Sequence, residues 1–231
     1  RWSKATEGSK MSTTFDHPLG ALFEDVALGA YPVPDGSIDV LGPLDGPCDS
    51  LTVFAGHVVI AADVSEEWVR QHTPERWDPD VADLSNAITR LVFDMAEKLG
   101  GSVAAPSTLC VASHQASIVH GELTEGGEPN RDWAAYRTDI KSYQYTSVGG
   151  NGTISIGTGP AGRCDLYHEV DHRTTKASGR TSQELLRTAK TLVPPGSALF
   201  GSAQLHDIRV LRSVIAARFE PVALEILFRT R

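Results

Sequence analysis

The chain has 231 residues, of which 41% are apolar and 22% are charged, and its formal net charge is −8 at pH 7. This composition is typical of a globular protein and excludes a largely disordered one, and the length can bury one large core or two small ones. Because an acidic chain has no general attraction for phosphate backbones or anionic lipid, we expect neither nucleic-acid nor membrane binding.

Cysteine usage and the N-terminal residues indicate where the protein works. Cys48, Cys110 and Cys164 lie far apart in the sequence, and their odd number argues against a disulfide framework and for a reducing compartment. No run is long and apolar enough to cross a bilayer, so we expect a cytoplasmic protein. Residues 1–10 are polar and precede Met11, and we interpret them as a tag or a disordered segment.

Residues 11–127 are expected to form a smaller N-terminal α/β domain. Up to residue 50, frequent Gly, Pro and Asp leave room only for short strands around Ala27–Tyr31 and Ile38–Leu41. The apolar, β-branched run Leu51–Asp63 then predicts either one bent strand or two strands joined by a turn.

The clearest helix of the first half is Asp83–Leu99. Its apolar residues recur at helical spacing, and Gly100-Gly101 supplies a C-terminal stop. We interpret Ser107–Ser113 as a further strand and the polar, Gly-containing stretch Gly121–Asn130 as a linker. The domain boundary is therefore placed between residues 127 and 128.

The second domain, residues 128–231, begins with an antiparallel meander. Two β-rich runs, Thr138–Ser147 and Thr153–Gly157, are separated by the turn Gly149–Gly152, which predicts a hairpin. The alternation in Arg163–Asp171 predicts the third strand of this meander.

Helices and strands alternate after the meander. A polar loop, His172–Ser182, leads to a predicted helix over Gln183–Val193, which ends at Pro194 because proline cannot continue the hydrogen-bond ladder. The remaining predicted elements are a strand at Ala198–Gln204, a helix at Ile208–Ala217 and a strand at Val222–Phe228.

This order of elements, with the sequence stretches GPAGRCDLYHEVD, LLRTAKTLVPPG, LFGSAQ and LRSVIAARFEPV, resembles the GNAT acyltransferase superfamily. It is similar in particular to bacterial GNAT-like proteins with an extra N-terminal domain, over Trp133–Phe228 and more loosely over Leu51–Leu99. The resemblance implies a mixed, mostly antiparallel sheet flanked by helices. It also implies an acyl-CoA-dependent N-acyltransferase that acts on a small-molecule amine, with acetyl-CoA or another acyl-CoA as co-substrate. Such proteins often pair through strand edges, so the resemblance makes a homodimer one possible assembly and leaves the oligomeric state open.

The resemblance also implies roles for individual residues. Backbone amides of a Gly-rich loop and the following helix N-terminus hold the pyrophosphate of acetyl-CoA in this family, because both favour anions. The implied cofactor-binding residues are Lys176, Gly179, Arg180, Thr181 and Ser182, together with the backbone of Val170. The implied catalytic residues are Glu169, as the base, and Tyr167.

Three positions depart from the family pattern. Thr181 stands where the loop has a small residue, Asp207 stands where the next helix has Asn, and Val214 stands where a Tyr often protonates the leaving thiolate. An anionic Asp207 near the phosphates would hinder CoA binding. An alternative is therefore a GNAT-fold protein that has lost ordinary acetyl-CoA use and carries out other small-molecule chemistry or ligand binding.

A third hypothesis is a metal-dependent enzyme. His168-Glu169-Val170-Asp171-His172 matches H-E-x-x-H, a zinc-hydrolase signature. That signature needs a helix, and on an extended strand the two histidines would lie roughly 13 Å apart, too far for one metal ion. The predicted strand thus favours coincidence, and we expect no metal ligands.

Overall fold

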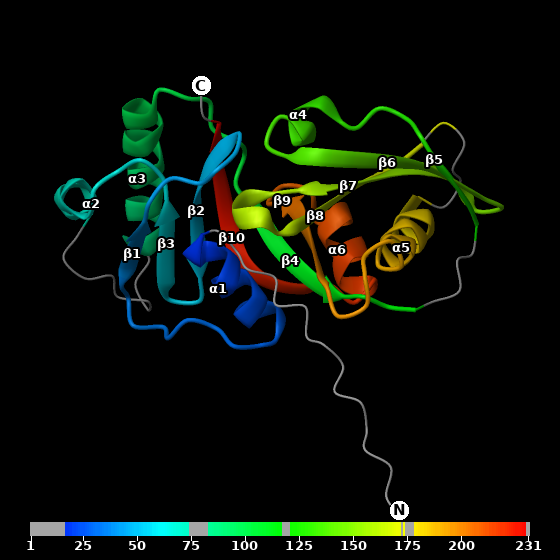
Figure 1. The fold of residues 1–231 in the computed structure, drawn as a ribbon, viewed down its shortest axis with the longest axis horizontal. Helices are drawn as coiled ribbons and strands as arrows, with labels where there is room; N and C mark the ends of the chain where they lie inside the picture. The colour runs from blue at the N-terminus through cyan, green and yellow to red at the C-terminus, as the bar shows by residue number, and fades with distance from the viewer. Residues whose placement is uncertain (1–16, 74–82, 117–120, 172, 174–177, 230–231) are drawn as a thin grey trace, which may run out of the picture.

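The computed structural model describes residues 17–73, 83–116, 121–171, 173 and 178–229 (Figure 1). One sheet of ten strands runs through this part of the chain, in the order β1-β3-β2-β10-β4-β9-β8-β7-β6-β5. The strands are β1 (Ile38–Leu41), β2 (Cys48–Phe54), β3 (His57–Ala61), β4 (Ser107–Ser113), β5 (Glu122–Glu125), β6 (Thr138–Ser147), β7 (Gly150–Thr158), β8 (Cys164–Val170), β9 (Ala198–Gln204) and β10 (Glu220–Arg229). Only the pairs β1–β3 and β8–β9 are parallel, which confirms the mixed, mostly antiparallel sheet.

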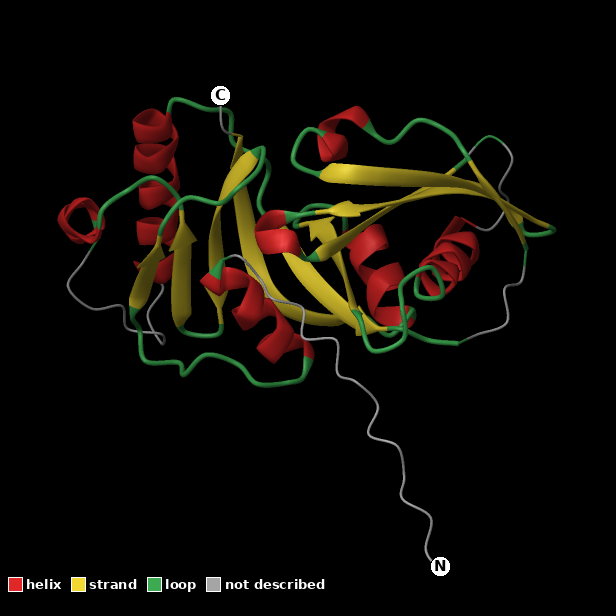
Figure 2. Ribbon diagram, in the orientation of Figure 1, coloured by secondary structure: helices red, strands yellow, loops and turns green. Residues whose placement is uncertain are grey.

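Six α-helices and one short 3-10 turn flank the sheet in the described residues (Figure 2). They are α1 (Pro18–Ala27), α2 (Glu66–His72), α3 (Asp83–Leu99), α4 (Arg131–Ala134), α5 (Ser178–Ala189), α6 (Ile208–Ala216) and the turn η1 (Pro160–Gly162). None of these helices is long and apolar enough to span a membrane.

The sheet separates three clusters of buried side chains. Alternate residues of β4 point to opposite faces, so that Cys110 packs beneath α5 and α6 while Leu109 packs beneath α1. The third cluster joins α3 to β2, β3 and β10 through residues such as Leu91 and Ile226. Helices α3, α5 and α6 therefore cover one face of the sheet, and α1 lies on the other.

The last strand joins the two halves of the chain. β10 lies between β2 and β4 and pairs antiparallel with both of them. The strands on either side of residue 127 consequently belong to one continuous sheet. The division into domains at residues 11–127 and 128–231 stays a prediction.

Several predicted elements are confirmed, and three are wrong. Leu51–Asp63 contains two strands, β2 and β3, joined by a turn. The strand expected near Ala27–Tyr31 does not form in the described residues. Ala27 is the last residue of helix α1 (Pro18–Ala27), and a turn and irregular backbone follow it. The expected linker Gly121–Asn130 contains β5, which pairs with β6. The helix expected over Gln183–Val193 runs instead over Ser178–Ala189.

Candidate functional site

The site begins where two parallel strands part. β8 and β9 share only two register pairs, Asp165 with Phe200 and Leu166 with Gly201, after which β8 continues for four residues without pairing to β9. Its other edge stays paired to β7 as far as Val170. A gap between β8 and β9 follows, bounded on one side by the free edge of β8.

Two backbone amides of β8 face this gap. The N–H of Asp171 donates to the carbonyl of Asn151 in the β7 segment at 2.9 Å. Because backbone groups alternate in direction along a strand, the N–H groups of His168 and Val170 point the opposite way, towards β9. The two N–H groups therefore point into the space between β8 and β9.

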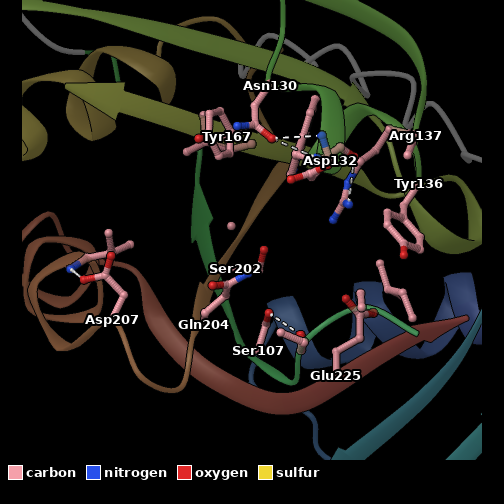
Figure 3. A pocket seen from close by; sticks show the side chains of 18 of the residues that line it. Ser107, Asn130, Asp132, Tyr136, Arg137, Tyr167, Ser202, Gln204, Asp207 and Glu225 are labelled. Atoms are coloured by element: carbon pink, nitrogen blue, oxygen red, sulfur yellow. Dashed lines mark hydrogen bonds between the residues drawn. The ribbon is translucent and has the colours of Figure 1, made fainter. Parts of the chain in front are cut away.

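A cavity of about 660 Å³ lies at this gap (Figure 3). Its walls come from both faces of the sheet. On the face of α5 and α6 the walls are mainly apolar, from Leu186, Val210 and Val214. On the opposite face they are polar, and they consist chiefly of Ser107, Asn130, Asp132, Tyr136, Arg137, Tyr167, Ser202 and Glu225. The cavity can therefore hold a molecule that passes through the sheet.

Helix α4 and its cap form part of the polar wall of the cavity. Asn130 caps it, since its side-chain Oδ1 accepts from the N–H groups of Asp132 and Trp133, both at 3.1 Å. The ring of Trp133 packs 5.9 Å from the ring of Tyr167 and 4.9 Å from the guanidinium carbon of Arg137. These contacts hold the α4 wall against β8.

The two predicted catalytic residues lie next to each other on β8, and only one reaches the cavity. Tyr167 lines it, whereas Glu169 is exposed and is not one of the lining residues. The Tyr167 hydroxyl donates to Glu169 Oε2 at 3.4 Å. Burial, with the Glu169 charge, raises the pKa of Tyr167 to about 12, so the phenol is protonated at neutral pH.

His168 lines the cavity from the opposite face of β8, and the sequence did not assign it this place. Its Nε2 lies 2.7 Å from the Oγ of Ser182, the fifth residue of α5. Burial lowers the pKa of His168 to about 4, so the ring is neutral at pH 7 and offers one donor and one acceptor. The sequence contained one signal for this position of His168. The alternation of residues in the predicted strand puts His168 on the same face as Leu166 and Val170.

The predicted phosphate-binding residues of the loop fall within the first five residues of α5, apart from Lys176, which lies outside the described residues. Gly179 and Arg180 are exposed, and Arg180 pairs with Glu184 at 3.3 Å. Thr181 and Ser182 are buried, and the Thr181 hydroxyl donates to the carbonyl of Gly149. Their side chains thus join α5 to β8 and the β6–β7 turn rather than facing solvent.

The two departures on α6 both lie in the cavity wall. Asp207 is the N-cap of α6, and its Oδ1 accepts from the N–H of Val210 at 3.1 Å. Val214 is 2% exposed and presents an apolar surface. The wall therefore has a carboxylate at the start of α6 and, at Val214 about two turns later, an apolar side chain.

Four buried charged side chains form a connected chain beside the cavity. Arg163 donates to Glu225 Oε1 at 2.5 Å and to Asp165 Oδ1 at 2.6 Å, and Arg137 donates to Asp165 Oδ2 at 3.0 Å. Burial would raise the pKa of Asp165, but the charges of Arg163 and Arg137 outweigh it and hold that pKa below its ordinary value. Arg163 also packs on the ring of Phe23, 4.6 Å from its centroid.

The H-E-x-x-H stretch does not have the conformation that zinc binding needs. His168, Glu169 and Val170 are extended in β8, and His172 lies outside the described residues. In the part of the chain that the structure describes, no group of three or more His, Cys, Asp or Glu side chains could hold a metal ion.

No protein-family model matches the chain. No curated protein matches it in sequence. Among solved structures it is similar to a GCN5-related N-acetyltransferase from Kribbella flavida, at 10% identity and a TM-score of 0.37, over 64% of each chain. It is also similar to an acetyltransferase of the GNAT family from Colwellia psychrerythraea, at 12% identity and a TM-score of 0.35, over 62% of this chain and 63% of that one.

A third similar structure is a tandem GNAT protein from the clavulanic acid biosynthesis pathway, with 12% identity and a TM-score of 0.35, over 78% of this chain and 63% of that one. The chain thus covers a little under two thirds of the length of these proteins. At such identities none of them supplies a residue role here.

Proposed function

We propose that the protein is an acyl-CoA-dependent N-acyltransferase that acts on a small-molecule amine. The supporting observation is the cavity that passes through the sheet where β8 and β9 part. The apolar wall of Leu186, Val210 and Val214 suits the flexible arm of an acyl thioester. The polar wall beneath α4 suits an amine, so the two reactants would meet at the gap.

The residues at the gap can supply the groups that acyl transfer needs. The nitrogen of the neutral amine attacks the thioester carbonyl, a C–N bond forms and the C–S bond breaks. The amine loses one proton to a base of the protein, and the thiolate gains one proton from solvent. The N–H groups of His168 and Val170, which face the gap, would stabilise the oxyanion. We assign proton removal to Glu169, acting through the Tyr167 hydroxyl with which it is hydrogen-bonded.

Calorimetry with acetyl-CoA and with CoA tests the proposal directly. We expect saturable binding by the unaltered protein, and no detectable affinity at millimolar concentration would remove the proposal. Tyr167→Phe should then lower kcat while leaving acetyl-CoA affinity within a factor of about two, because it removes only the hydroxyl that contacts Glu169.

The second candidate is ligand binding or other chemistry in the same cavity without acyl-CoA. The observation that favours it is Asp207, a carboxylate in the cavity wall where an anionic cofactor would lie. Asp207→Asn keeps the helix cap, since Asn caps as well as Asp, and removes the charge. If repulsion by Asp207 is what excludes CoA, the unaltered protein shows no CoA binding and the Asn variant gains it.

A cytoplasmic location and a homodimer stay predictions for this function. Sedimentation equilibrium of the full chain would decide the second of them, because a monomer at micromolar concentration would exclude pairing through the edge strands.

A further inference from the structure

The buried charges form a linear chain, and its two ends face the cavity. The order is Glu225, Arg163, Asp165, Arg137, so that negative and positive charges alternate. Their relative exposures are 2%, 3%, 2% and 8%, respectively. Of the four, Glu225 and Arg137 line the cavity, whereas Arg163 and Asp165 lie behind its wall.

The four charges of this row of side chains sum to zero, but the row has a negative end and a positive end. Each interior member is neutralised from two sides, since Arg163 contacts two carboxylates and Asp165 contacts two guanidinium groups. Within the described residues, each end member forms an ion pair with one partner only, Glu225 with Arg163 and Arg137 with Asp165. The cavity therefore meets a negative pole at Glu225 and a positive pole at Arg137.

Both poles keep hydrogen-bonding capacity. Arg137 has five N–H groups, and its contacts within the described residues, with Asp165 through Nε and Nη2 and with the Trp133 carbonyl through Nη1, occupy three of them. Each Glu225 oxygen accepts one bond from Arg163 and can accept another. An anion can thus bind to Arg137 and a cation to Glu225 without breaking the chain.

We propose that the α4 side of the cavity binds a zwitterionic α-amino acid, whose carboxylate pairs with Arg137 and whose ammonium group pairs with Glu225. Such a ligand closes the alternating chain into a ring, in which every charge has opposite charges on both sides. This inference rests on the proposed function, because it gives the class of the small-molecule amine. It concerns binding alone and assigns no step of the transfer reaction.

The distance between the poles suits a small zwitterion. Three contacts of 2.9, 3.2 and 2.7 Å join Arg137 Nη2 to Glu225 Oε2 through Asp165 Oδ2 and Arg163 Nη2, so the poles lie no farther apart than these steps laid end to end. A bridging ligand forms one hydrogen bond of roughly 2.8 Å at each pole. Even at this upper limit, the span left between the two hydrogen bonds is no longer than the separation of the ammonium and carboxylate groups in an α-amino acid, so such a ligand can reach both poles.

The test is amino-acid binding by the full chain without CoA. Thermal shift with each of the twenty L-amino acids at millimolar concentration, followed by calorimetry, should reveal at least one that binds. Its decarboxylated amine and its N-acetyl derivative should each bind at least tenfold more weakly, because each lacks one charge. If no amino acid binds, or if the amine alone binds equally well, the proposal is overturned.

Variants locate the two charges. Glu225→Gln and Arg137→Lys should each weaken amino-acid binding at least tenfold, while Arg131→Gln, an exposed cation on α4 that does not line the cavity, should leave it unchanged. Loss of binding in Arg229→Gln with retention in Arg137→Lys would assign the carboxylate to Arg229 and overturn the proposal. If the Glu225 or Arg137 variant does not fold, the ligand series with the unaltered protein still decides.

A failure here is distinguishable from a failure of the proposed function. A protein that binds acetyl-CoA but no amino acid keeps the acyltransferase proposal and refutes the zwitterion site. A protein that binds an amino acid but no acyl-CoA keeps the zwitterion site and refutes the acyltransferase proposal.

Discussion

The lowered pKa of His168 predicts how the free energy of unfolding changes with pH. The folded protein binds a proton at His168 with a pKa of about 4, whereas an unfolded chain binds it near 6.5. Between these values the unfolded state holds more protons, so the free energy of unfolding falls as the pH falls. The stability is fully present above pH 6.5 and is lost progressively down to pH 4.

The magnitude follows from the two pKa values. A complete shift of this size corresponds to about 3 kcal/mol, at 1.36 kcal/mol for each pKa unit, and the part lost between pH 7.5 and pH 5 is about 2 kcal/mol. Since His168 retains some exposure beside the cavity, these are upper values.

Urea unfolding followed by tryptophan fluorescence at pH 7.5 and pH 5 measures the effect. The unaltered protein should lose about 2 kcal/mol more than His168→Gln over this interval, because Gln does not titrate and all other groups are common to both proteins. An equal pH dependence in the two proteins would refute the reasoning. So would an imidazole pKa near 6.5 measured by NMR.

Three further predictions concern buried groups. Burial raises the pKa of Cys48 and of Cys110 to about 12 and that of Cys164 to about 11. The native protein at pH 8 should therefore react with a thiol reagent far more slowly than the urea-unfolded chain. Equal reaction rates would contradict this prediction. Arg163→Met should lower the free energy of unfolding by about 3–5 kcal/mol, because it leaves two buried carboxylates with one remaining cation; a loss under 1 kcal/mol in urea titration would show that the carboxylates reach water. Gly152→Ala should cost about 1–3 kcal/mol, since the new Cβ would collide with the carbonyl of Glu169, whereas Gly179→Ala on the open side of α5 should be neutral or slightly stabilising. Similar losses in these two variants would count against the packing beneath α5.

The sequence predicted the elements whose pattern comes from apolar packing. Asp83–Leu99, Thr138–Ser147 and Ala198–Gln204 have the predicted bounds. The helix has an apolar stripe at helical spacing, and the two strands are β-rich runs next to turn residues. The start of α5 was missed because its first five residues, Ser178–Ser182, are small or polar and show no apolar periodicity. Thr181 and Ser182 bond to Gly149 and His168, and a search for apolar periodicity does not detect such bonds.

The candidate site was predictable only in part for a similar reason. The extended backbone predicted for Arg163–Asp171 follows from its local alternation, and β8 covers Cys164–Val170. The polar wall of the cavity could not be predicted from local pattern. Arg163 contacts Glu225 across 62 residues of sequence, and Arg137 contacts Asp165 across 28. Single charged residues in a strand or a loop give no sign of partners so distant.

The energetics of this chain of charges bear on why the fold contains it. Removing four charged groups from water is costly, and replacing buried ion pairs by apolar side chains of similar volume is often neutral or stabilising. Stability alone therefore gives little reason for Arg163 and Glu225 to be charged, since Phe23 and Phe200 already surround Arg163 with apolar surface. A ligand that meets both poles gives such a reason, because it recovers in binding the electrostatic interaction that each end of the chain lacks.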